Sequence, residues 1–103
     1  MIDPKTIRDR LVDEFDYPET NLDSVIDKII AMSPDVFAAF EKWFNTGVIA
    51  DVEVEGFSYA SVKEKRAKMN PIAIYLTLDW LAREPVRAKA SLARPLNPLN
   101  HNR

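Results

Sequence analysis

The chain has 103 residues, which suits one domain, and 47% of them are hydrophobic, enough for a core without covalent cross-links. The absence of cysteine excludes disulfide bonds, thiolate zinc sites and thiol catalysis, and it agrees with a reducing compartment. With two glycines the chain has few positions that can turn sharply without strain, which argues against a many-stranded sandwich or barrel. The net charge of −2 is the sum of an acidic N-terminal half and a basic C-terminal half.

The N-terminal part of the chain contains two predicted helices. Asp3 is a favoured N-cap and Pro4 fits the first helical position, so the first helix begins there and ends before Pro18. A second helix begins near Thr20 or Asn21, and an apolar stripe at helical spacing continues to Ile30. Both helices are amphipathic, so each is expected to bury one face.

A third helix begins at Ser33-Pro34, which repeats the signal of a cap residue followed by proline, and it ends at Gly47. Its apolar face consists of Val36, Phe37, Phe40, Trp43 and Phe44. Aromatic residues at this spacing are more often core than binding surface. We expect Trp43 or Phe44 to stay partly exposed because both lie at the helix end.

The period then changes to two, which predicts a strand over residues 48–55, ended by Gly56. Its candidate strand-pairing residues are Val48, Ala50, Val52 and Val54. No mate for this strand is evident elsewhere in the chain. It could pair with the tail near Leu96, with a second copy of the protein or with a strand of another protein. The remaining alternative is an irregular connector whose valines dock on the core.

Three more helices complete the prediction. A short basic helix has Ser58 near its cap, an almost wholly apolar helix follows Asn70 over 71–83, and an Ala-rich helix extends from Glu84 to Arg94. A helix as apolar as 71–83 is normally the buried centre of a bundle. The predicted fold is therefore mainly α: a compact bundle of about five to six short helices around residues 71–83, with at most one short strand or β-hairpin near 48–55. We expect one domain over 1–94 and a loose tail over 95–103.

The charges are divided between the two halves of the chain. Residues 1–57 hold thirteen acidic and five basic side chains, whereas residues 58–103 hold three acidic and nine basic ones. The halves could pack together so that their fields partly cancel, or one pole could face a partner. The candidate basic interaction patch consists of Lys63, Lys65, Arg66 and Lys68.

No residues are predicted to be catalytic, to bind a metal or to bind a cofactor. The acidic side chains of residues 51–55 are expected to form a solvated strand face, because no calcium-loop pattern accompanies them. The sole histidine, His101, lies in the predicted tail, where nothing would orient it as a catalytic base. Two isolated glycines exclude a phosphate-binding loop. We expect a chain that is not an enzyme.

The sequence favours a small helical module that acts through protein–protein contacts, as a regulator or adaptor, with an unidentified protein partner or with a second copy of itself. The alternative is a small nucleic-acid-binding regulator, because residues 58–83 resemble a degenerate helix-turn-helix outline with a basic first helix. A third option is that the acidic half presents a nucleic-acid-like surface to a basic protein. No apolar run is long enough to span a membrane and the N-terminus is not a secretory signal, so we expect a cytoplasmic protein.

Overall fold

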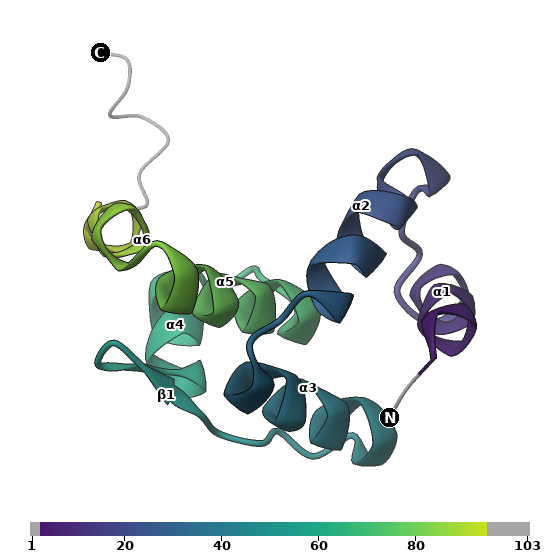
Figure 1. Cartoon of the computed structure of the whole chain (residues 1–103), viewed down its shortest axis with the longest axis horizontal. Coiled ribbons are helices and arrows are strands. Elements are labelled where there is room, and N and C mark those ends of the chain that lie inside the picture. The colour runs from purple at the N-terminus through teal and green to yellow at the C-terminus, as the bar shows by residue number, and fades with distance from the viewer. Residues whose placement is uncertain (1–2, 95–103) are drawn as a thin grey trace.

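The computed structural model of the chain describes residues 3–94, and it is mainly α-helical with one short β-hairpin, as the sequence predicts (Figure 1). The predicted tail over residues 95–103 lies outside the described residues. The elements are α1 (Pro4–Asp13), α2 (Glu19–Ile30), α3 (Pro34–Thr46), β1 (Glu53–Val54), β2 (Phe57–Ser58), α4 (Tyr59–Lys65), α5 (Pro71–Arg83) and α6 (Pro85–Ala93).

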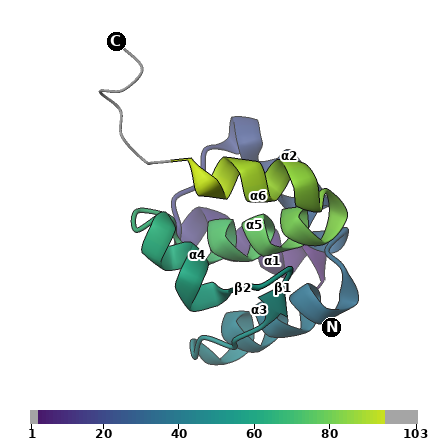
Figure 2. The same ribbon diagram turned by 90° about the vertical axis from the view of Figure 1, so that its left-hand side faces the viewer.

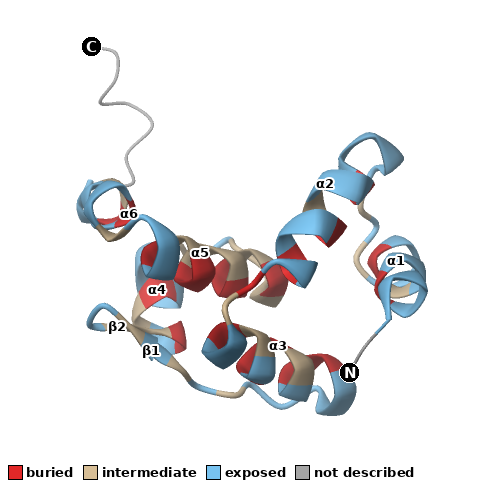
Figure 3. Cartoon of the chain, viewed as in Figure 1, coloured by how far each residue is buried: buried red, intermediate tan, exposed pale blue. Residues whose placement is uncertain are grey.

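Helix α5 is the central element, which confirms the prediction for residues 71–83. It packs against α3, α4, α6 and β1 (Figure 2). The side chains that it buries are Ile72, Ile74, Tyr75, Leu78, Asp79 and Leu81. In Figure 3 the buried faces of α2, α3 and α5 turn toward one another. These residues belong to a single apolar core cluster that draws side chains from all six helices.

Helices α1, α4 and α5 begin with the side-chain caps that the sequence predicts, whereas α2, α3 and α6 have no side-chain capping hydrogen bond within residues 3–94. The side-chain oxygens of Asp3 and Asn70 accept the backbone N–H three residues later, at 2.8 and 2.9 Å. Ser58 and Ser61 form a reciprocal capping box at the start of α4. Ser33 occupies the N-cap position of α3, but its side chain makes no capping hydrogen bond. At the start of α3 the Ser33 backbone N–H instead donates to the Asp79 carboxylate of α5.

The predicted strand has a mate, and it is the segment immediately after it. Strands β1 and β2 pair antiparallel, with Val54 opposite Phe57. The two residues between them, Glu55 and Gly56, have positive φ angles of 53° and 85°. Positive φ at both central positions is the geometry of a type I′ turn, whose twist matches that of a hairpin. The expectation that no mate lies nearby in the chain is thus wrong, because the Glu-Gly pair is itself a turn.

The strand is also much shorter than its pattern. Of the four candidate strand-pairing residues only Val54 lies in β1, whereas Val48, Ala50 and Val52 lie in the connector that follows α3. Ala50, Val52 and Val54 are half-buried against the core, and Val48 is 61% exposed. The Tyr75 hydroxyl donates to the Ala50 carbonyl at 2.7 Å and accepts the Ala50 N–H at 3.1 Å. Side-chain docking and these two bonds hold the connector in place, and they use up backbone groups of Ala50 that strand pairing would need.

Helices α1 and α2 form a hairpin that covers one end of α3. The Phe15 ring lies 5.7 Å from the Trp43 ring, and the Arg10 guanidinium lies 4.0 Å above the Phe44 ring and donates to the Phe44 carbonyl. Trp43 and Phe44 are consequently both buried, at 8% and 1% exposure, so the expectation that one of them stays partly exposed is wrong. Phe37, farther from that helix end, is the half-buried aromatic residue of α3.

Candidate functional site

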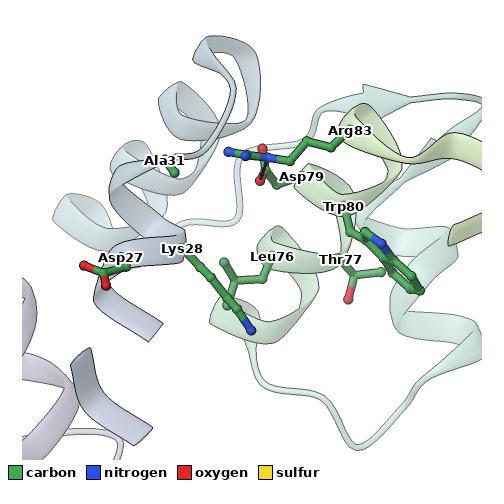
Figure 4. A pocket seen from close by; sticks show the side chains of 8 residues that line it. All are labelled: Asp27, Lys28, Ala31, Leu76, Thr77, Asp79, Trp80 and Arg83. Carbon is green, nitrogen blue, oxygen red and sulfur yellow. Dashed lines mark hydrogen bonds and ion pairs between the residues drawn. The ribbon is translucent and has the colours of Figure 1, made fainter. Parts of the chain in front are cut away.

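A cleft of about 500 Å³ lies between α2 and α5, and it is the candidate functional site (Figure 4). Its volume falls within the range of roughly 300–1,000 Å³ that is usual for binding pockets. The cleft is open to solvent along one side, and its walls are largely apolar. It is lined by Asp27, Lys28, Ala31, Leu76, Thr77, Asp79, Trp80 and Arg83.

The apolar surface of the cleft comes chiefly from Leu76 and Trp80 of α5. Both side chains are half-buried: they pack partly against the core and leave the rest of their surface to the cleft. They are four positions apart along the helix, so they lie one above the other on a single face. Ala31 faces them from the end of α2 and leaves room because it is small. The central helix thus exposes one apolar stripe, although its other faces are covered.

A buried carboxylate fixes the polar end of the cleft. Asp79 is only 5% exposed; its Oδ1 accepts the Ser33 backbone N–H at 2.7 Å and its Oδ2 accepts Arg83 Nε at 2.7 Å. Both carboxylate oxygens are therefore used within the protein. Arg83 engages Asp79 through Nε, and its side chain is 48% exposed. Its terminal nitrogens remain accessible at the cleft, in an orientation that Asp79 holds.

The other cleft cation, Lys28, comes from α2. Figure 4 shows its side chain extending toward α5, whereas the Asp27 carboxylate points away from α5. Lys28 is exposed, and no ion pair joins it to another residue within 3–94. Because the Asp79 charge is matched by Arg83 and the Asp27 carboxylate points away from α5, Lys28 is, among the described residues, the unpaired charge that extends toward α5 across the cleft.

The four residues of the predicted basic patch do not share one environment. Lys63, Lys65 and Lys68 are exposed, and within the described part of the chain they form no ion pair. Arg66 is half-buried, and its guanidinium donates to the Ser91 carbonyl of α6 at 2.8 Å. Arg66 therefore joins the end of α4 to α6, and it is committed to that contact. The patch reduces to three lysines, and none of them lines the cleft.

Two of the three acidic side chains of residues 51–55 have structural partners, and the third, Glu53, is exposed. Asp51 Oδ1 accepts the backbone N–H groups of Val52 and Tyr59, both at 3.1 Å, and Glu55 forms an ion pair with Lys89 at 3.0 Å. Within residues 3–94 no three acidic or histidine side chains converge in a way that could hold a metal ion. The sole histidine, at position 101, lies outside the described residues.

The groups with shifted pKa values lie away from the cleft. Burial raises the pKa of Tyr75 and of Tyr59, whose rings are 5.1 Å apart in the core. Hydrogen bonding from the first turn of α1 lowers the pKa of Asp3, and the Arg10 guanidinium lowers that of Glu14. These shifts reflect core packing and helix capping.

The sequence analysis did not identify the cleft residues as a site. The apolar pattern of 72–81 indicates burial on every side, and periodicity alone does not tell which face lacks a neighbour. One usable signal was present: Leu76, Trp80 and Arg83 fall on one helix face and join two large apolar groups to a cation. The α2 side of the cleft carried no such signal.

Comparisons of this chain with protein-family models, with curated proteins and with solved structures found no match. No helix within residues 3–94 is both long and apolar enough to cross a membrane. Only the geometry of the cleft therefore indicates a function.

Proposed function

We propose that this chain is a non-enzymatic helical module that acts through protein–protein contacts, as a regulator or adaptor, and that the α2–α5 cleft is its contact surface. The observation that carries this proposal is the apolar stripe of the central helix, Leu76 and Trp80, which packs partly against the core and leaves the rest of its surface to the cleft. Trp and Arg are the residues most enriched among the energetic anchors of interfaces, and the cleft contains one of each.

A nucleic-acid-binding regulator is the second candidate, and three exposed lysines support it: Lys63, Lys65 and Lys68. They would contact phosphate, so binding would weaken steeply with salt and show little sequence preference. The burial of α5 weighs against a helix-turn-helix at residues 58–83, because the second helix of that motif must present an exposed face to the major groove.

A capture experiment with matched variants tests the proposed function. The immobilised wild-type chain, the variant Ala31→Arg, which fills the cleft, and the variant Ala38→Arg, which changes an exposed position of α3, are each exposed to cell lysate. We expect at least one protein to be retained by the wild type and by Ala38→Arg but lost from Ala31→Arg. A set of captured proteins that is the same for all three chains would refute the assignment to the cleft.

The nucleic-acid alternative is tested separately. A gel-shift series from low to physiological salt compares the wild type with a triple variant in which Lys63, Lys65 and Lys68 become Gln. Binding of the wild type that the triple variant loses would favour a nucleic-acid function. We expect no shift at any salt concentration.

A further inference from the structure

We infer that the occupant of the α2–α5 cleft is an amphipathic helix of a partner protein, with apolar anchors in its centre and carboxylates on both flanks. This inference rests on the proposed protein-binding function and adds the chemistry of the partner. It is supported by the shape of the cleft, by the kind of side chains on its floor and by the sign of its accessible charge.

The shape of the cleft fits a helix. Its α5 wall comprises residues 76, 77, 79, 80 and 83, which extend over about two turns, or roughly 10 Å. Residue 76 is three or four positions from 79 and 80, and these are four and three positions from 83, so the four residues share one face of the helix. Side chains at this spacing form the ridges that one helix packs against another. The opposite wall, Lys28 and Ala31, spans one turn of α2. A helix laid between these walls would cover the uncovered stripe of α5 as α3, α4 and α6 cover its other faces.

The floor of the cleft calls for large apolar anchors. Leu76 and Trp80 keep part of their apolar surface exposed, and an amphipathic helix would cover both with side chains at positions i, i+3 or i+4, and i+7. Ala31 permits the incoming backbone to approach α2 closely. The Trp80 indole N–H makes no hydrogen bond within the described residues, so it offers one directional donor at the edge of this surface.

The charges of the cleft favour a partner with acidic side chains. Lys28 extends from one wall and Arg83 from the other, so cations flank the apolar floor on both sides. Asp79 already pairs with Arg83 through Nε and accepts the Ser33 N–H, so a partner carboxylate would meet Arg83 through its terminal nitrogens, whereas Lys28 has no ion pair within residues 3–94 and Asp27 points away from α5. A helix with Glu or Asp on either side of its apolar stripe would pair with both cations, whereas a basic helix would be repelled.

A selection among displayed helical peptides tests this inference. A surface-displayed library with fixed helical framework and randomised face positions is selected on the intact chain, with prior removal of peptides that bind Ala31→Arg. We expect enriched peptides to carry Leu, Phe or Trp at i, i+3 or i+4, and i+7, flanked by Glu or Asp. The best peptide should lose about tenfold in affinity for Lys28→Glu and keep its affinity for Lys42→Glu, a matched change at an exposed lysine of α3.

The outcomes separate this inference from the proposed function. Enriched peptides with basic flanks, or no cleft-dependent peptide at all, would overturn the acidic helix. A cleft-dependent lysate partner that binds without such a helix would leave the proposed function standing while this inference fails. A nuclear magnetic resonance titration with dodecanoate, a small amphiphile, is a further test. If the Trp80 indole N–H resonance shifts with dodecanoate but with none of the peptides, the cleft binds a small ligand and the helix proposal fails.

Discussion

At the scale of single residues, Asp79 connects more of the molecule than any of its neighbours in the cleft. It lies on the central helix, accepts the Ser33 N–H at the start of α3, and orients Arg83 one turn further along α5. Its bond to Ser33 satisfies one of the free N–H groups at the start of α3, where a side-chain cap is missing. The same carboxylate therefore supports the fold and aims a cation at the cleft.

Removal of Asp79 should destabilise the fold more than removal of its partner. Asp79→Ala leaves the part-buried Ser33 N–H without an acceptor, which costs about 1–3 kcal/mol. Arg83→Ala removes a half-exposed partner, so we expect a smaller loss, roughly 0–1 kcal/mol. Asp79→Asn, which keeps one acceptor oxygen, should fall between them. Urea unfolding followed by circular dichroism measures all three, and equal losses for Asp79→Ala and Arg83→Ala would contradict this account.

The buried tyrosines predict a loss of stability in alkali. Burial raises the pKa of Tyr59 and Tyr75 above the ordinary value near 10, so the folded state holds these protons more tightly than the unfolded chain does. Their stabilising contribution is complete below the unfolded pKa and is lost as the pH rises through the folded value.

Tyr59→Phe should therefore flatten the fall in the free energy of unfolding above pH 10 and change stability little at pH 7, since no hydrogen bond of the Tyr59 hydroxyl is found within the described residues. Unfolding curves at pH 7 to 11 measure the slope. The exposed substitution Ala60→Ser, next to Tyr59, is the control, and an unchanged slope in Tyr59→Phe would refute the assignment.

At the scale of elements, local chemistry predicted the helices well and the hairpin poorly. Asp3-Pro4, Ser33-Pro34 and Asn70-Pro71 each mark a helix start, because a cap residue and a fixed proline φ act within one turn. The alternating valines indicated extended backbone but not pairing. The turn signal at Glu55-Gly56 is atypical, since Asn or Asp usually occupies the first position.

Substitutions in the connector before β1 should lower stability only where the side chain faces the core. Val52 is half-buried against the core, and Glu53, next to it, is exposed. Val52→Glu places a charge against apolar side chains and should lower the free energy of unfolding by about 1–3 kcal/mol. Glu53→Lys should change it by no more than about 0.5 kcal/mol. Denaturation measures stability and sedimentation velocity measures assembly; equally small effects of both substitutions would show that valine docking contributes nothing.

At the scale of the whole molecule, the cleft depends on how distant segments are placed, and this is why the sequence did not reveal it. The apolar pattern of α5 correctly predicts a central helix, but burial of Leu76 and Trp80 is decided by where α2 ends relative to α5. That placement follows from long-range contacts such as Asp79 with Ser33 and Phe15 with Trp43. The sequence likewise shows that residues 1–57 are acidic and residues 58–103 are basic. It does not show that Lys89 of the basic half forms an ion pair with Glu55 of the acidic half.

The single core cluster predicts that the chain unfolds in one cooperative step. The α1–α2 hairpin contributes buried residues to the same cluster as α3 and α5, and Phe15 joins it to Trp43. Circular dichroism, which reports all helices, and fluorescence, which is sensitive to the environment of Trp43, should therefore give coincident urea transitions. This outcome would support the prediction of one domain over residues 1–94.

Phe15→Ala tests the coupling directly. Loss of a half-buried aromatic contact should cost about 1–3 kcal/mol, and both transitions should shift together if the α1–α2 hairpin unfolds with the rest. Val12→Ala, at a 40% exposed position of α1, is the control and should shift neither by more than about 0.5 kcal/mol. A dichroism transition with two separate steps would mean that the hairpin unfolds alone. The α2 wall of the cleft would then be lost before the α5 wall, so partner binding would report the stability of that hairpin.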